Sequence, residues 1–146
     1  MRAALRAGAP ETGGLDLPRF YDHARDRLTP LAYVADRSMR ESGFDPSDRF
    51  GPFGLGVLDY APVCLNSLLY AMERDTAAIL RELGDAPGAR PWDARAERRG
   101  QLVRELLWDE GRGLFLDYDF VRGERRDYPF ATAFFPLWVG AASPAL

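Results

Sequence analysis

The residues of this chain that could do chemistry are concentrated in one short stretch, Arg40–Phe50. Five ionisable side chains lie there around a glycine and a proline. Gly43 can adopt backbone angles that other residues avoid, and Pro46 keeps Asp45 out of the helical region. A carboxyl held on such a turn can be a general acid, with its pKa raised by apolar neighbours or lowered by nearby arginines. The alternative is a capping aspartate followed by surface charges, and the residue types alone leave both open.

Composition excludes several other kinds of chemistry. The 146 residues carry a net charge of −3 without a basic stripe, so no nucleic-acid partner is expected. No apolar run reaches the roughly 18 residues of a membrane span, and residues 1–6 contain no apolar signal core, so we expect a cytoplasmic protein without a membrane partner. Cys64 is the only cysteine and His23 the only histidine, which excludes an internal disulfide and a Cys/His zinc site. We expect no metal and no cofactor.

Apolar residues at helical spacing predict the elements that position the Arg40–Phe50 stretch. Thr29-Pro30 supplies a cap followed by proline at the first helical position. Three glycines and a proline make residues 51–60 an irregular loop, and residues 1–18 are predicted to be a loop or a cut edge. Helices are predicted over part of Phe20–Leu28 and over residues 30–40, 65–83, 91–108 and 130–139.

The spacing of apolar residues changes from helical to alternating near residues 113–126. This predicts a short β-hairpin, with Arg122-Gly123 at its turn. Asp117 and Asp119 could form a carboxylate pair, but the hairpin context favours structural or surface roles. The last predicted helix is apolar nearly all round, which indicates burial on several sides. The chain is therefore expected to be a fragment of a larger protein.

Four segments resemble one enzyme family. "ADRSMRESGFDPSDRF" (Ala35–Phe50) resembles the segment of trehalases that bears the general acid, and it is most similar to the neutral type. "PVCLNSLLYAMERD" (Pro62–Asp75) resembles the helix that follows in trehalases. "LLWDEGRGLFLDYDFVRGERR" (Leu106–Arg126) resembles the family's hairpin, and "ATAFFPLWVG" (Ala131–Gly140) its next helix. Order and spacing agree over residues 30–140.

The resemblance implies a mainly α fold, part of a toroid of six helical hairpins, an (α/α)6 barrel. Residues 1–146 would form a single partial catalytic domain. The implied reaction is the inverting hydrolysis of the disaccharide α,α-trehalose to two glucoses, without metal or coenzyme. Inversion needs two carboxyl groups roughly 6.5–9.5 Å apart, so that a water fits between one of them and the sugar.

The resemblance also implies roles for individual residues. Asp45 matches the family's general acid, and Arg40 and Gly43 match positions that contact substrate. "APET" (Ala9–Thr12) is similar to a Pro-Glu-Thr element of neutral trehalases, which makes Glu11 a further candidate for sugar binding.

Two features depart from the family pattern. The general base of trehalases is a glutamate in a glycine-rich segment far downstream, and no such segment occurs here. We therefore expect this polypeptide to be inactive alone and to depend on the remainder of its parent chain. Cys64 stands where trehalases usually have aspartate, and we interpret it as a small buried residue. Two alternatives stay open: a non-catalytic sugar-binding or regulatory remnant, and a toroidal glycosidase that acts on another α-glucoside.

Overall fold

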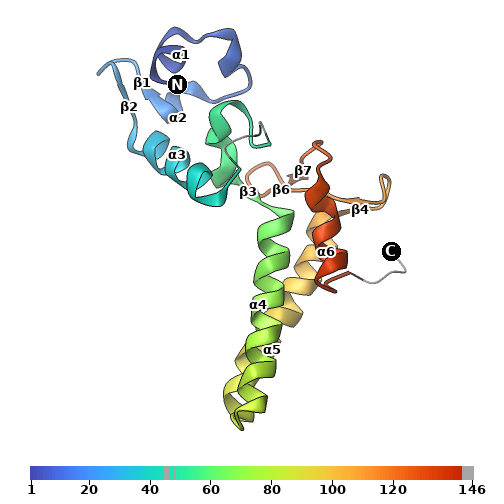
Figure 1. Ribbon diagram of the computed structural model, residues 1–146. Coiled ribbons are helices and arrows are strands. Elements are labelled where there is room, and N and C mark those ends of the chain that lie inside the picture. The colour runs from blue at the N-terminus through green and yellow to red at the C-terminus, as the bar shows by residue number, and fades with distance from the viewer. Residues whose placement is uncertain (45–46, 48, 143–146) are drawn as a thin grey trace. The chain divides into compact units, whose positions relative to one another are not determined.

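The computed structural model describes residues 1–44, 47 and 49–142 (Figure 1). The chain is mainly helical, with short antiparallel strands, and divides into two compact units, Met1–Tyr60 and Ala61–Leu146. Each unit has its own hydrophobic cluster. Of the helices that the structure describes, none has both the length and the apolar character needed to cross a membrane.

The first unit has five short elements before its main helix. Its elements are α1 (Arg2–Ala7), η1 (Pro10–Thr12), α2 (Leu17–Phe20), β1 (Tyr21–Asp22), β2 (Arg27–Leu28), α3 (Pro30–Ser42) and the 3-10 segment η2 (Pro52–Asp59), and β3 (Tyr60–Ala61) leads into the second unit. The core of the first unit consists of Leu5, Phe20, Tyr21, Ala32, Ala35 and Leu55. Leu5 is fully buried, which gives α1 a packing reason to form where composition alone predicted a loop.

Helix α3 confirms the prediction over residues 30–40 and extends it by two residues. The hydroxyl of Thr29 accepts a hydrogen bond from the Ala32 amide at 3.3 Å, and Pro30 begins the helix. Gly43 ends it in the left-handed conformation, with φ of 74°.

The helix predicted within Phe20–Leu28 is wrong. β1 and β2 form a hairpin there, with Tyr21 opposite Leu28. The Tyr21 hydroxyl donates to the Asp26 carboxylate across the turn, and the Asp22 carboxylate accepts the Arg25 amide at 3.1 Å. These side-chain contacts favour the turn over a helix.

Residues 51–60 were predicted to be an irregular loop and instead form the kinked segment η2. Two consecutive residues, Phe53 and Gly54, have φ of 56° and 65° at the kink. A Cβ atom on Gly54 would lie 2.3 Å from Cγ of Met39, which is buried on α3. Gly54 is therefore required both by its backbone angle and by the close approach of η2 to α3.

Gly54→Ala in the full-length protein is expected to lower the free energy of unfolding by about 2 kcal/mol, because left-handed strain and overpacking add. Urea unfolding would measure the loss. Gly14→Ala is the matched control, since Gly14 has φ of 84° but no atom within 4 Å of the added Cβ. That variant should lose only about 1 kcal/mol, from strain alone. Equal losses for the two variants would contradict the packing argument.

The second unit is built on a long helical hairpin. Helices α4 (Val63–Glu82) and α5 (Ala86–Leu102) pack side by side, and α6 (Phe135–Trp138) lies against α4 (Figure 1). The remaining elements are the π-helical turn η3 (Val103–Leu107), the strands β4 (Trp108–Asp109), β5 (Leu114–Phe115), β6 (Tyr118–Asp119) and β7 (Glu124–Arg125), and the 3-10 turn η4 (Ala131–Phe134). The core consists of Val63, Val103, Leu107, Phe115 and Ala142.

Helix α5 begins five residues before the predicted start at Pro91. The Asp85 carboxylate caps it by accepting the Gly88 amide at 2.9 Å. Pro91 lies inside the helix, where its missing N–H costs one backbone hydrogen bond.

The predicted hairpin near residues 113–126 is confirmed in its second half, where Tyr118 pairs with Arg125. Its first residues belong to another hairpin, in which Phe115 pairs back with Trp108. The predicted helix over residues 130–139 is divided into η4 and α6. Pro136 lies in the first turn of α6 and has no amide to continue the preceding turn as an α-helix.

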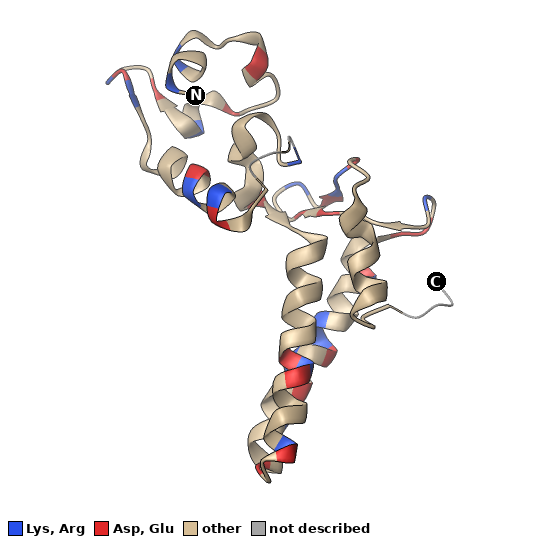
Figure 2. Cartoon of the chain, viewed as in Figure 1, with Lys and Arg blue, Asp and Glu red and all other residues tan. Residues whose placement is uncertain are grey.

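The apolar stripe of α4 is exposed along much of its length. Ile79 is 58% exposed and Leu83 76%, and on α6 Trp138 is 73% exposed. The burial on several sides that the sequence indicated for the last helix is therefore not found within the described residues. The first half of α4 also carries no charged residue, and the charges of the hairpin lie along its other half (Figure 2).

Candidate active site

The candidate site lies at the C-terminal end of α3. The Ser42 hydroxyl donates to the Met39 carbonyl at 2.6 Å and accepts the Phe44 amide at 3.3 Å. The Gly43 amide donates to the Arg40 carbonyl at 3.3 Å, and a Cβ on Gly43 would meet no atom within 4 Å. The chain thus leaves the helix through a small residue that leaves open space around its Cα.

The predicted general acid follows directly. Asp45 lies outside the described residues, as do Pro46 and Asp48. The structure therefore reports on the residues on both sides of Asp45 and not on its carboxyl.

Arg40 is held in place by Asp36, one helical turn before it. Its Nε and Nη2 atoms donate to the two carboxylate oxygens of Asp36 at 3.0 and 3.1 Å. Both side chains line an open pocket of about 320 Å³, together with Met1, Met39, Ser47, Phe53 and Gly54. A guanidinium fixed in this way presents its N–H groups in a defined plane, which suits recognition of hydroxyl groups.

A second ion pair on α3 balances the charge beside the pocket. Arg37 Nε donates to the Glu41 carboxylate at 2.8 Å, and this hydrogen bond raises the pKa of Arg37. The pair is exposed, so its contribution to stability is small. Residues of both charges lie close together along this end of α3 (Figure 2).

Residues that follow Asp45 in the chain contact Phe44. The Phe44 carbonyl accepts from Ser47 twice, from the amide at 3.1 Å and from the hydroxyl at 3.0 Å. Arg49 is only 1% exposed, and its guanidinium carbon lies 4.8 Å from the centre of the Phe44 ring and 5.2 Å from that of Phe50. From the sequence, Arg49 was one of the arginines near Asp45. That it is followed by Phe50 in the sequence was a signal that its guanidinium could stack on an aromatic ring.

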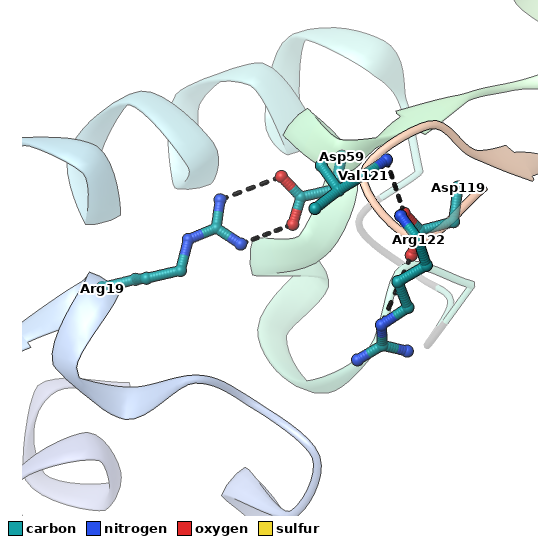
Figure 3. Close-up of polar contacts among 5 residues, drawn as sticks. All are labelled: Arg19, Asp59, Asp119, Val121 and Arg122. Atoms are coloured by element: carbon teal, nitrogen blue, oxygen red, sulfur yellow. Dashed lines mark hydrogen bonds and ion pairs between the residues drawn. The ribbon is translucent and has the colours of Figure 1, made fainter.

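A bidentate ion pair ties α2 to the end of η2. The Arg19 guanidinium donates to both oxygens of Asp59, at 2.6 and 2.9 Å (Figure 3). Arg19 also lies over the Phe20 ring, 5.5 Å from its centre. This pair anchors η2, which lines the Arg40 pocket.

Glu11 is not brought to this pocket. It lies in η1 and is exposed, and the lining of the Arg40 pocket does not include it. Its buried neighbour Thr12 fixes the turn instead, with its hydroxyl donating to the Ala9 carbonyl at 2.6 Å.

The aspartates of the hairpin have structural roles, as their context indicated. Asp117 is buried, and its carboxylate accepts the Val63 amide at the start of α4 at 2.8 Å. Asp119 accepts the amides of Val121 and Arg122 at 3.0 and 2.9 Å, inside its own turn (Figure 3). Cys64 is buried, as expected, and the carboxylate at this helix start comes from Asp117.

A larger hollow of about 560 Å³ lies on the α4–α5 hairpin, lined by Glu73, Ala94, Arg95, Arg98, Arg99 and Leu102. Its one lining carboxylate, Glu73, is in a bidentate pair with Arg99, with both distances 2.8 Å. Arg99 Nη1 also donates to Asn66 Oδ1 at 3.0 Å. The hydrogen bond that Arg99 donates to Glu73 raises the pKa of Arg99. The Glu73 carboxylate is thus engaged in a structural ion pair.

The described part of the chain contains no group of three or more His, Cys, Asp or Glu side chains that could hold a metal ion. The pocket at Arg40 combines a guanidinium paired with Asp36, the Ser47 side chain and the ring of Phe53, and Gly43 lies at the end of the same helix. Such a pocket can bind a hydroxyl-rich ligand.

Comparison with known proteins finds one family. A sequence profile described as trehalase matches residues 21–146. The cytosolic neutral trehalase of Beauveria bassiana is 36% identical over 148 residues, which cover 86% of this chain and 19% of that protein. The probable trehalase of Eremothecium gossypii is 36% identical over 121 residues, which cover 76% and 16%.

A solved structure is also similar. The neutral trehalase Nth1 from Saccharomyces cerevisiae matches with a TM-score of 0.67 and 33% identity, over 76% of this chain and 22% of that one. The mainly α fold therefore matches part of the helical toroid of that enzyme. The chain spans about a fifth of the length of these relatives.

Proposed function

This chain belongs to the trehalase family, and we propose from that premise that the full-length protein hydrolyses α,α-trehalose to two glucoses with inversion. The structural observation that supports the proposal is the end of α3, where Arg40 lines an open pocket and Gly43 leads the chain into Asp45. The relatives carry trehalase in their names, and several are called cytosolic, which supports the cytosol as the proposed compartment.

Asp45 is the proposed general acid. It would protonate the glycosidic oxygen as the bond to the departing glucose breaks. A second carboxylate would remove a proton from water on the opposite face of the sugar ring, which inverts the configuration of the attacked carbon. We propose that the rest of the full-length protein supplies this base, since the 146 residues lack the glycine-rich glutamate segment that the resemblance calls for.

Arg40 and Gly43 are the proposed sugar contacts. The Arg40 guanidinium is paired with Asp36 at the pocket lining, and the Arg40 side chain is 66% exposed, so that a sugar can reach it. Gly43 has no side chain between its backbone and the open space beside it, which lets a sugar ring approach closely. Glu11 stays a proposal on the resemblance of its segment alone, because the structure places it outside the pocket lining.

The substrate can be tested directly with the full-length protein. Incubation with trehalose, maltose, sucrose and glucosylglycerate is expected to release glucose fastest from trehalose. Proton NMR of the first product should show equal amounts of α- and β-glucose, because inversion changes one of the two anomeric centres. Two α-glucoses would contradict inversion. Cleavage of another α-glucoside in preference to trehalose would favour the alternative substrate, and sugar binding without hydrolysis would favour a non-catalytic role.

A further inference from the structure

Three side chains of the first unit, Phe44, Arg49 and Phe50, form a cluster that we call the loop clamp. The two rings contact each other with centres 5.1 Å apart. The guanidinium carbon of Arg49 lies 4.8 Å from one ring centre and 5.2 Å from the other. Arg49 and Phe50 are 1% and 2% exposed. A flat, permanently charged group thus lies against both rings at once, away from water.

The clamp joins the two ends of the segment that contains Asp45. Phe44 comes directly before Asp45, and Arg49 and Phe50 come shortly after it. The backbone is fixed at the same two places. On one side the Phe44 carbonyl accepts from Ser47, and on the other the Phe50 carbonyl accepts from the Gly56 amide at 3.1 Å.

The hydrogen bond at Phe50 depends on a close approach of Gly56 to the Phe50 carbonyl. A Cβ on Gly56 would lie 2.6 Å from the Phe50 carbonyl oxygen, so only glycine permits this hydrogen bond without a shift. The Phe50 ring also contacts the Tyr60 ring, with centres 5.3 Å apart. Phe50 is therefore a rigid base against which Arg49 and Phe44 are held.

We propose that Arg49 is a positioning residue for the reaction, because the loop clamp holds both ends of the short segment that carries Asp45. This inference rests on the proposed function in one respect, the role of Asp45 as general acid. A proton donor misplaced by about 1 Å loses roughly a hundredfold in rate. Lysine would keep the charge of Arg49 but not its plane, so it could not lie against both rings in the same way.

Arg49→Lys in the full-length protein is the test. Its kcat for trehalose is expected to fall by roughly 10- to 100-fold, with KM changed by less than about threefold, since the displaced group acts in bond breaking and not in sugar binding. Hydrogen exchange of the amides from Phe44 to Phe50 is expected to rise by at least about tenfold, because local opening becomes easier. Phe44→Leu, which removes one ring and leaves the charge, should change both measurements in the same direction.

Arg95→Lys is the matched control. Arg95 also lies over an aromatic ring, with its guanidinium carbon 4.8 Å from the centre of Trp92, but it is on α5 of the second unit and is not among the residues of the clamp or of the Arg40 pocket. Its replacement should change neither kcat nor the exchange of residues 44–50. If Arg49→Lys behaves like this control, the positioning role is wrong.

The two measurements separate this inference from the proposed function. Exchange does not depend on turnover, so unchanged exchange in Arg49→Lys overturns the clamp even if trehalose is hydrolysed. Raised exchange with unchanged kcat shows that the clamp holds the segment but does not position the acid, which overturns the catalytic part of the inference. Failure of the wild-type protein to hydrolyse trehalose contradicts the proposed function, and the exchange result then decides the clamp by itself.

Discussion

Asp45→Asn in the full-length protein is expected to lower kcat for trehalose by roughly a thousandfold, the typical contribution of a general acid. Asparagine has nearly the shape of aspartate but no proton to give to the departing oxygen. KM should change little, because the proposed sugar contacts, Arg40 and Gly43, remain. Steady-state rates of glucose release would measure the effect, and urea unfolding should show a stability close to that of the wild-type protein.

Two comparisons make this result specific. Glu41→Gln removes another carboxyl from the same segment, but Glu41 is exposed and paired with Arg37, so its kcat should be unchanged. With α-glucosyl fluoride as substrate the loss in Asp45→Asn should be much smaller, because fluoride departs with little need for a proton. A variant that turns over trehalose normally would remove Asp45 from the mechanism.

Glu73→Ala is expected to destabilise the second unit by about 3 kcal/mol, as for other ion pairs broken inside a protein. The side chain of Glu73 is 7% exposed and that of Arg99 29%, so the change leaves a partly buried arginine without its carboxylate. The pair joins α4 to α5 by two hydrogen bonds of 2.8 Å. Urea unfolding of the full-length protein, followed by circular dichroism, would measure the loss.

The hairpin contains its own control for this prediction. Arg81 and Asp93 form a second ion pair between α4 and α5, with side chains 51% and 43% exposed. Arg81→Ala should cost less than about 1 kcal/mol, because water already screens that pair. Changing Glu73 and Arg99 together to leucine should restore much of the stability, since no unpaired charge remains. Equal losses from Glu73→Ala and Arg81→Ala would show that burial does not govern these pairs.

Local signals in the sequence were sufficient for some elements. The start of α3 follows from Thr29-Pro30, and its end from Gly43. Such caps act through neighbouring backbone groups, so a short window contains all the interacting partners. The turn at Arg122-Gly123 is predictable for the same reason, since the Gly123 amide bonds to the Asp119 carbonyl at 2.8 Å within one hairpin.

Other elements depended on side-chain contacts that spacing does not show. The region from Phe20 to Leu28 has helix-like spacing, but the bond between Tyr21 and Asp26 closes a hairpin there. The apolar stripe of α4 shows which face avoids water, but not what covers it, and Ile79 is 58% exposed. Periodicity describes one element at a time, while burial is a property of the surroundings.

The candidate site also has features that the sequence indicated and features that only the structure shows. Arg40, Gly43 and Asp45 were recognisable because their types and spacing resemble a family pattern, and family membership is supported by 36% identity to a neutral trehalase. The pairing of Arg40 with Asp36 was open to sequence reasoning, since residues four apart meet on a helix. The pocket that Arg40 and Asp36 line could not be predicted in this way, because Phe53 and Gly54 belong to a separate segment.

The amino-acid sequence by itself thus indicated the family and the long helices, and it is the basis for proposing Asp45 as the proton donor, since each of these rests on residues close together in the chain. Tertiary structure settled which charged groups are buried. Arg49 lies against two rings, Glu73 is paired with Arg99, and Asp117 caps a helix that begins 54 residues before it. The cost of burying a charge depends on the partners that surround it in space, and those partners come from distant parts of the sequence.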